Sequence, residues 1–142
     1  MHLSYYEDSV SETLIGLDNV VNHTVRGPHP AGNVGIHIHH IAPLSSNDHV
    51  WVINAQDVAR IGNFFLTGEL DVSLIITLGG PSVLNPIHIK SRLGAPVSLY
   101  LEDNIKDGEQ RIISGDVLTG DTIDVDDFLG FYDSSIAVLP EG

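Results

Sequence analysis

Three histidines crowd into four positions of the stretch GPHPAGNVGIHIHH, residues 27–40. His37 and His39 are two positions apart, and residues with that spacing on a β-strand point to the same face. Two imidazoles on one face suit a metal ion, but a catalytic zinc site needs a third protein ligand and an open position. No HExxH motif occurs, and no spacing selects a third histidine. We therefore interpret the pair first as packed or surface histidines on a strand, with a metal site as the alternative.

The loop before these histidines and the start of a predicted helix offer two further candidate sites. Glycines such as Gly32 let a ligand approach the backbone closely, and consecutive backbone N–H groups can bind an anion. Asn54 ends an apolar run and begins a helix, whose first N–H groups can bind a phosphate or a carbonyl. No GxGxxG, phosphate-loop or GxSxG motif accompanies them. We predict no catalytic residue and no bound metal, and the candidate substrate-binding residues are Pro30, Gly32, His37, His39 and Asn54.

The hydrophobic pattern predicts three elements that would position these residues. Alternating apolar residues predict a strand over 36–42, and the continuous apolar run VWVI predicts a strand over 50–53 that is buried on both faces. A helix is predicted over 55–67, because apolar residues recur there at helical spacing. Asn54 is its predicted N-cap, and Gly68 is suited to end it.

The pattern changes at Asp71. Residues 72–142 predict a small mixed sheet of about five strands with one short helix near 97–101, because short apolar runs alternate there with glycine and proline turns. Near the N-terminus, the apolar patch Thr13–Leu17 and the alternating run VVNHTV predict one or two strand fragments. We therefore divide the chain into residues 1–71, a partial α/β domain, and a second module that follows it.

Composition excludes several classes of function. The 142 residues include 19 acidic and six basic ones, which gives a formal net charge of −13. Such a chain repels phosphate backbones and anionic lipid headgroups, so we predict no nucleic-acid partner. The longest apolar run falls short of the roughly 18 residues of a membrane span, so no direct membrane insertion is predicted. The absence of cysteine excludes disulfides, thiolate metal sites and cysteine nucleophiles in this chain.

Five separated motifs resemble, in the same order, the A subunits of the sodium-translocating NADH:quinone oxidoreductases. They are GPHPAGNVGIHIHHIAP, VWVINAQDVARIGNFFLTGEL, SRLGAP, RIISGDVLTG and FLGFYDSSIAVLPEG. The resemblance runs from about residue 26 to the end of the chain. It implies that this chain is an internal fragment of a longer protein.

The family in turn resembles the flavin-binding subunit of respiratory complex I and the C subunit of the Rnf complex. The resemblance implies an α/β + α+β fold class. Residues 1–71 would be the C-terminal part of a degenerate Rossmann-like α/β domain, and residues 72–142 would be a β-grasp module of the soluble-ligand-binding (SLBB) type.

The same resemblance bears on cofactors. A strand–turn–helix with the sequence VINNVET lies beside the flavin in the flavin-binding protein of complex I. Val52, Ile53 and Asn54 match its first three residues, whereas Ala55 replaces the second asparagine. The resemblance therefore implies no tightly bound cofactor in this chain, with a quinone as a ligand of the full complex.

The resemblance also implies a place in the cell and a role. The chain would belong to a peripheral subunit on the cytoplasmic side of the bacterial inner membrane, with the other subunits of the complex as partners. It would have a docking or structural role and a quinone-proximal role, with no catalysis alone. Strand edges left uncovered predict self-association. Two alternatives stay open: a small metal-dependent enzyme that uses the HxH strand, and a stand-alone β-grasp ligand-binding adaptor.

Overall fold

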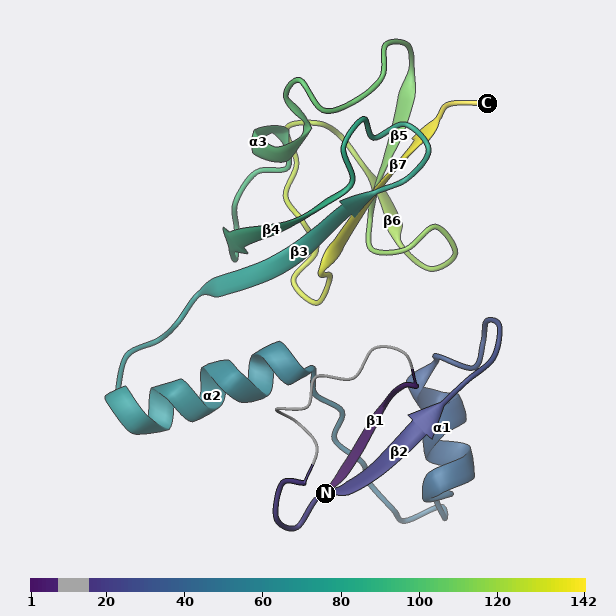
Figure 1. Ribbon diagram of the computed structural model, residues 1–142, viewed down its shortest axis with the longest axis vertical. Helices are drawn as coiled ribbons and strands as arrows, with labels where there is room; N and C mark the ends of the chain where they lie inside the picture. The colour runs from purple at the N-terminus through teal and green to yellow at the C-terminus, as the bar shows by residue number, and fades with distance from the viewer. Residues whose placement is uncertain (8–15) are drawn as a thin grey trace. The chain divides into compact units, whose positions relative to one another are not determined.

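The computed structural model describes residues 1–7 and 16–142, which form two compact units, Met1–Val52 and Ile53–Gly142 (Figure 1). In the first unit, strand β1 (His2–Tyr6) pairs in parallel with strand β2 (Val21–Val25). The run VVNHTV is therefore a strand, as predicted, whereas most of the predicted patch Thr13–Leu17 lies outside the described residues. None of the described residues of this unit is buried.

The strand predicted over 36–42 is wrong, because this segment lies in helix α1 (Val34–Ile41). Asn33 is the N-cap residue, and its carbonyl accepts the backbone N–H of His37 at 3.2 Å. The half-buried side chains recur at helical spacing and not at every second position: His37, Ile38 and Ile41. The alternation of isoleucine and histidine was misleading because β propensity depends on a pleated surface to pack against. The Asn33 side chain makes no capping hydrogen bond, and the His37 ring of the helix instead bonds to the Ser4 hydroxyl on β1 at 2.9 Å.

The strand predicted over 50–53 is also wrong. This segment is extended but belongs to no strand among the described residues, and all four of its side chains are exposed. Trp51 is 96% exposed, so the segment is far from being buried on both faces. A continuous apolar run forms a buried strand only where neighbouring strands are present on both sides, and the described residues provide none.

Helix α2 (Ala55–Thr67) has the predicted bounds. Asn54 occupies the N-cap position, where its carbonyl accepts the N–H of Val58 at 3.0 Å, although its side chain makes no capping hydrogen bond. Gly68 ends the helix with a φ of 75°, and its N–H donates to the carbonyl of Phe64 at 2.8 Å. Glycine adopts this left-handed conformation without the penalty of a Cβ atom, which explains why the sequence located the end correctly.

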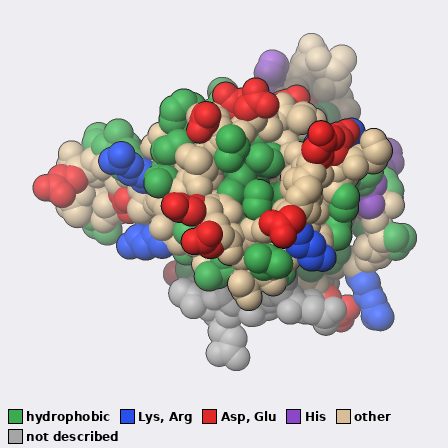
Figure 2. Space-filling view, turned by 90° about the horizontal axis from the view of Figure 1, so that it is seen from above, with side chains coloured by type: hydrophobic (Ala, Val, Ile, Leu, Met, Phe, Trp, Pro, Cys, Tyr) green, Lys and Arg blue, Asp and Glu red, His purple; other side chains and the backbone are tan. Residues whose placement is uncertain are grey.

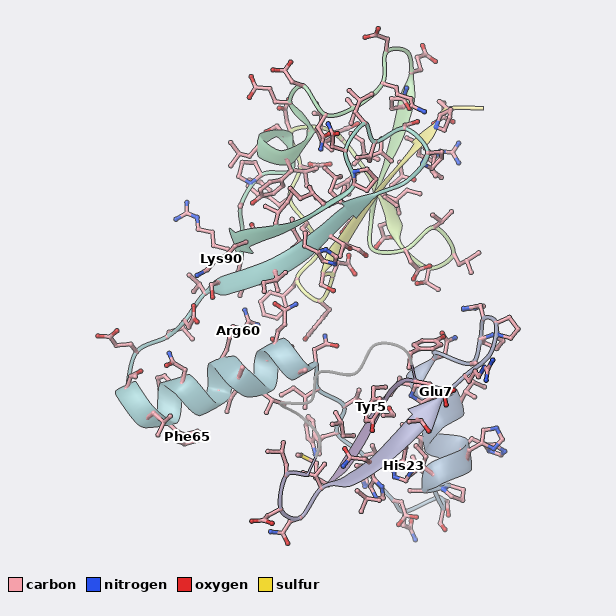
Figure 3. The ribbon with its side chains drawn as sticks, viewed as in Figure 1. Tyr5, Glu7, His23, Arg60, Phe65 and Lys90 are labelled. Carbon is pink, nitrogen blue, oxygen red and sulfur yellow. The ribbon has the colours of Figure 1, made fainter. Side chains whose placement is uncertain are left out.

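The predicted apolar face of α2 is not buried. Phe65 and Leu66 are 83% and 87% exposed, and Phe65 projects from the side of the helix opposite Arg60 (Figure 3). The helix is tied to the following strand by one side chain, because the Gln56 amide donates to the carbonyl of Ile75 at 2.9 Å and accepts its N–H at 2.8 Å. No helix in the described part of the chain is long and apolar enough to cross a membrane.

The second unit contains a five-stranded mixed sheet and the short helix α3 (Ser98–Leu101). Its strands are β3 (Ser73–Gly79), β4 (Ile87–Arg92), β5 (Gln110–Ser114), β6 (Asp121–Ile123) and β7 (Ser135–Pro140). Their order across the sheet is β4-β3-β7-β5-β6, with β3 and β7 parallel and the other neighbours antiparallel. The prediction of a small mixed sheet with one short helix is confirmed.

The hydrophobic core lies on one face of this sheet. Along β3, Leu74, Ile76 and Leu78 are buried, whereas Ile75 between them is 52% exposed, which is the alternation expected of a strand with one covered face. The other core side chains come from the remaining strands, from α3 and from the loops: Val83, Val97, Leu101, Ile112, Ile136 and Val138. Gly80 has to be glycine, because a Cβ atom there would lie 2.3 Å from the carbonyl oxygen of Val138.

Two surface hydrogen-bonded pairs hold the ends of the sheet. Asp71 accepts the backbone N–H of Ser73 at 2.8 Å just before β3, and this bond lowers the pKa of the Asp71 carboxyl. Arg111 on β5 forms a two-point ion pair with Glu141 after β7. The same hydrogen bonds raise the pKa of Arg111 and lower the pKa of Glu141.

Candidate ligand cleft

A cleft of about 550 Å³ lies in the first unit between β2 and α1. Residues from β2 and its end form one wall, residues of α1 form the other, and the loop before α1 contributes one residue. The lining residues are Asn22, His23, Thr24, Val25, Arg26, Ala31, Ile36, His37, His40 and Ile41. Clefts of about 300–1,000 Å³ are typical of small-molecule sites.

His37 links helix α1 to strand β1 and to the loop before α1. Its Nε2 lies 2.7 Å from the carbonyl oxygen of Ala31, and its Nδ1 lies 2.9 Å from the hydroxyl of Ser4 on β1. A carbonyl can only accept, so Nε2 carries the proton and, when the ring is neutral, the Ser4 hydroxyl donates to Nδ1. Both ring nitrogens are thus used within the protein, and His37 offers a ligand only its ring surface.

The polar groups on the β2 side are partly engaged. His23, labelled in Figure 3, stacks on His2 with ring centroids 5.1 Å apart, and its Nε2 lies 2.9 Å from the Nδ1 of His2. Arg26 lies 3.7 Å from Glu7, and both side chains are largely exposed. An exposed ion pair at this distance contributes little, so the Arg26 guanidinium can turn towards a ligand at small cost.

The remaining lining groups define what the cleft could bind. The side-chain oxygen of Asn22 is buried and accepts no hydrogen bond from the described residues, so a ligand or water donor could satisfy it. The apolar side chains of Val25, Ile36 and Ile41 line the same space. His40 and Arg26 can donate hydrogen bonds. The cleft therefore suits a largely apolar ligand with oxygen acceptors for His40 and Arg26, while the Asn22 oxygen needs a hydrogen-bond donor from the ligand or from water.

Only one of the predicted substrate-binding residues lines this cleft, namely His37. Pro30 and Gly32 flank the lining residue Ala31, and a Cβ atom at Gly32 would lie 2.6 Å from the Tyr6 hydroxyl, so a larger residue there would have to displace the Tyr6 ring. His39 is exposed and is not a lining residue, and Asn54 belongs to the second unit.

Sequence reasoning missed Asn22, Arg26 and His40. The signal for His40 was present, because on a helix His37 and His40 are three positions apart and share a side. The incorrect strand interpretation placed His40 on the face opposite His37 and so concealed it.

The metal-site alternative assumed that His37 and His39 share one face of a strand, and this assumption is wrong. His37 and His39 lie on a helix, where residues two positions apart point about 200° apart around the axis, so the two rings do not converge. His39 instead contacts His40 edge-on, with ring centroids 5.0 Å apart. No group of three metal-ligating side chains occurs within residues 1–7 and 16–142.

Comparison with protein families gives two matches, in order along the chain. Residues 1–70 match the NqrA second alpha/beta domain, and residues 75–124 match the NQRA C-terminal domain, an SLBB module. Both family domains are mixed α/β in content, as is the chain. The first match includes helix α2, whereas the contacts within the structure group α2 with the sheet that follows it.

Comparison with individual proteins agrees with the family matches. The chain is 50% identical over 117 residues to the A subunit of the Na(+)-translocating NADH-quinone reductase of Pasteurella multocida, covering 82% of the chain and 26% of that protein. It is 44% identical over 143 residues to the corresponding protein of Histophilus somni, covering 100% of the chain and 32% of that protein. For Neisseria meningitidis the identity is 45% over 125 residues, covering 87% and 28%. The chain thus spans about a third or less of the relatives it matches.

Proposed function

Because the chain belongs to the NqrA family of the Na(+)-translocating NADH-quinone reductases, we propose that it acts within such a complex, as a docking and structural part of the peripheral subunit. The observations that carry this proposal are the ordered match to two NqrA domains and the identity of 44–50% to A subunits of such reductases. Its place would be the cytoplasmic side of the bacterial inner membrane, its partners the other subunits, and the chain alone would not catalyse NADH oxidation.

We propose further that residues 1–71 are the end of a degenerate Rossmann-like domain and that residues 72–142 are a β-grasp module. The parallel pairing of β1 and β2 supports the first assignment, since parallel strands are typical of α/β domains. The strand order of the second unit is β4-β3-β7-β5-β6, in which β3 and β7 are parallel neighbours. These are the first and last strands of the unit along the chain, and this topology supports the second assignment.

The β2–α1 cleft is where we propose that a quinone ring lies close to this chain. A quinone is a flat, apolar ring with two carbonyl acceptors. The apolar lining residues would contact its ring, while His40 and Arg26 would donate to its oxygens. Substrate binding by Pro30, Gly32, His39 and Asn54 stays a prediction, and for His37 we propose that its ring packs against the ligand.

We expect no tightly bound flavin in this chain. At the positions that correspond to the flavin-proximal segment, Ala55 has no side-chain donor, and the Gln56 amide is already engaged by the backbone of Ile75. These residues do not fit a flavin site. The measurement is the visible spectrum of the purified chain, which should lack flavin absorbance near about 450 nm. A stoichiometric flavin would contradict this expectation.

The quinone proposal is tested in the assembled complex that carries these residues. His40→Ala should raise the KM for quinone several-fold and leave the KM for NADH unchanged, because one donor to the quinone oxygen is lost. His49→Ala is the matched control, since His49 is an exposed histidine of the same unit that does not line the cleft. Equal effects of the two substitutions, or none, would refute a quinone in the cleft.

We also propose that the chain self-associates when no other subunit is present. The apolar segment 50–53 and the apolar side chains Phe65 and Leu66 are exposed, and extended apolar surface of this kind promotes association. Light scattering should give a mass above that of one chain at high protein concentration. A monomer over the whole concentration range would argue against it.

A further inference from the structure

Two turns at one end of the five-stranded sheet present exposed apolar side chains side by side. The first turn joins β5 to β6 and carries Val117 and Leu118, which are 56% and 70% exposed. The second precedes β7 and carries Phe131 and Tyr132, which are 72% and 86% exposed and whose rings meet edge-on at 5.0 Å. Because β5 and β7 are antiparallel, the end of one and the start of the other lie at the same end of the sheet (Figure 1).

The first turn is held in one conformation by its own hydrogen bonds. The side chain of Asp116 accepts the backbone N–H groups of Leu118 and Thr119 at 2.7 and 3.1 Å. Its carbonyl accepts the N–H of Gly120 at 2.8 Å. The apolar side chains at its tip are therefore presented on a rigid backbone, which lowers the entropy lost when a partner binds.

The second turn is anchored on the end of β5. The buried hydroxyl of Ser114, the last residue of β5, donates to Asp133 at 2.5 Å and accepts the N–H of Gly130 at 2.8 Å. Asp133 closes the turn through its own N–H, which donates to the carbonyl of Gly130 at 3.0 Å. Ser114 thus fixes the second turn to the end of the strand from which the first turn begins.

The charge of this region has one sign. Residues 116–133 contain six aspartates and no lysine, arginine or histidine, and no basic residue follows as far as residue 142. Five of the six are exposed: Asp116, Asp121, Asp124, Asp126 and Asp127. The net charge of −13 is also visible on the face drawn in Figure 2, where acidic side chains outnumber basic ones. Between these aspartates, Val125 and Phe128 are 45% and 57% exposed. We call residues 116–133 the acidic–aromatic surface.

We propose that the acidic–aromatic surface docks a lysine- and arginine-rich cytoplasmic segment of a membrane-embedded subunit of the complex. This inference depends on the proposed function, which supplies a membrane-embedded partner. Cytoplasmic loops of membrane proteins carry an excess of lysine and arginine, and that charge complements the aspartates. Cationic groups also bind favourably over aromatic rings such as those of Phe131 and Tyr132.

Other occupants are less well matched to this surface. A second copy that paired through this same surface would bring its six aspartates against the six described here, so like charges would repel. The headgroups of an anionic bilayer would be repelled by the same aspartates. A cationic and partly apolar polypeptide satisfies both the charge and the exposed aromatic rings.

Photo-cross-linking in the assembled complex tests the identity of the occupant. A benzophenone amino acid replaces Tyr132, and the adduct is identified by mass spectrometry. We expect a membrane-embedded subunit, cross-linked within a segment rich in lysine and arginine. The same probe at Leu99, which is 65% exposed on α3, should give no such adduct. Adducts with a second copy of NqrA, with lipid only, or none at all would overturn the proposal.

Salt dissociation tests the contribution of charge. Asp121→Asn, Asp124→Asn and Asp126→Asn together remove three carboxylates whose oxygens make no hydrogen bond among those described, so the fold should be retained. We expect the triple variant to release NqrA from the complex at a several-fold lower NaCl concentration than the unsubstituted complex. Glu102→Gln with Asp103→Asn, in another loop, is the control and should behave like the unsubstituted complex. Equal retention of the triple variant would overturn the proposal.

The same preparation separates this inference from the function on which it depends. If the subunit that carries these residues purifies with an active complex but the Tyr132 probe reacts elsewhere, the docking surface is refuted and the proposed function stands. If this subunit never purifies with the membrane subunits, the proposed function itself fails.

Discussion

The five-stranded sheet and the N-terminal unit differ in whether their strands have neighbours. In the sheet, β3 lies between β4 and β7, and β7 lies between β3 and β5, so the apolar side chains of these strands are covered. In residues 1–52, β1 and β2 have only each other, and no described residue is buried. A two-stranded sheet is at best marginally stable alone, whereas a sheet of three or more strands with a covered apolar face can be stable by itself. The sheet unit therefore has a hydrophobic core, whereas the described residues of the N-terminal unit form a cleft.

Helix α2 is intermediate between the sheet and the N-terminal unit in how far its local structure is accompanied by burial. It forms with full length and normal ends, but its apolar side chains are exposed and a single glutamine joins it to the sheet. Strand β3 pairs with β7 only from Thr77 to Gly79, so the backbone N–H and carbonyl of Ile75 are not used by β7. The Gln56 amide bonds to both of these groups. Local capping and propensity therefore suffice to form a helix here, while burial requires a partner surface.

The largest effect is expected from the core of the sheet. Ile76→Ala removes a side chain that is 1% exposed and should lower the free energy of unfolding by about 2–5 kcal/mol, because it leaves a cavity. Urea denaturation followed by circular dichroism measures this. The matched substitution in the N-terminal unit, Ile36→Ala, alters a side chain that is 38% exposed and should cost under about 1 kcal/mol. A larger cost at Ile36 would reverse the comparison.

A smaller effect is expected at the link between α2 and the sheet. Gln56→Ala removes two hydrogen bonds to Ile75 and should cost about 1–2 kcal/mol, whereas Gln56→Glu keeps the acceptor and should cost less. Asn63→Ala, on the same helix, controls for changes in helix propensity and should be close to neutral. If the two Gln56 variants are as stable as the unsubstituted protein, the link does not contribute.

A comparable effect, confined to the other unit, is expected from His37→Ala. This substitution removes the hydrogen bonds to Ser4 and Ala31 and should cost about 1 kcal/mol. Amide exchange should become faster in α1 and stay unchanged in β3 and β7. Faster exchange in the sheet as well would mean that the two units do not respond independently.

The smallest effect is expected from Asp71. Its folded pKa lies below the ordinary value of 3.8 because the Ser73 N–H stabilises the carboxylate. The stability it contributes is therefore present above its unfolded pKa and is lost as the pH falls below about 3.8 through the folded pKa. Asp71→Asn should reduce the slope of stability against pH in that range only. An unchanged slope below pH 4, roughly the unfolded value, would contradict this assignment.

The parts of the fold that the sequence predicted are those whose determinants are local. Helix α2 was located by an N-cap asparagine, helical spacing and a C-terminal glycine, and the sheet was located by period-two runs between turns. The strand predictions for residues 36–42 and 50–53 were wrong because each was made from a short apolar pattern that fits more than one structure. What decided between structures was non-local: the bonds of His37 to Ser4 and Ala31 in one case, and the lack of strand neighbours in the other.

The candidate site was predicted less well than the fold. His37 was found because histidine is conspicuous, but Asn22 lies on β2, Arg26 follows the end of that strand, and neither belongs to a motif. Their place beside α1 depends on the pairing of β2 with β1, which alternation alone does not reveal. The acidic–aromatic surface was concealed for the same reason, because the Ser114 hydroxyl at the end of β5 fixes a turn that is distant along the chain.

Native-state hydrogen exchange, resolved by residue, tests the contrast between the two units most directly. The slowest amides should lie in β3, β5 and β7, around Ile76, Ile112 and Val138, with those of β1, β2 and α1 exchanging orders of magnitude faster. If the amides of β1, β2 or α1 exchanged as slowly as those of the sheet, the N-terminal unit would have a stable core of its own, and the account would be contradicted.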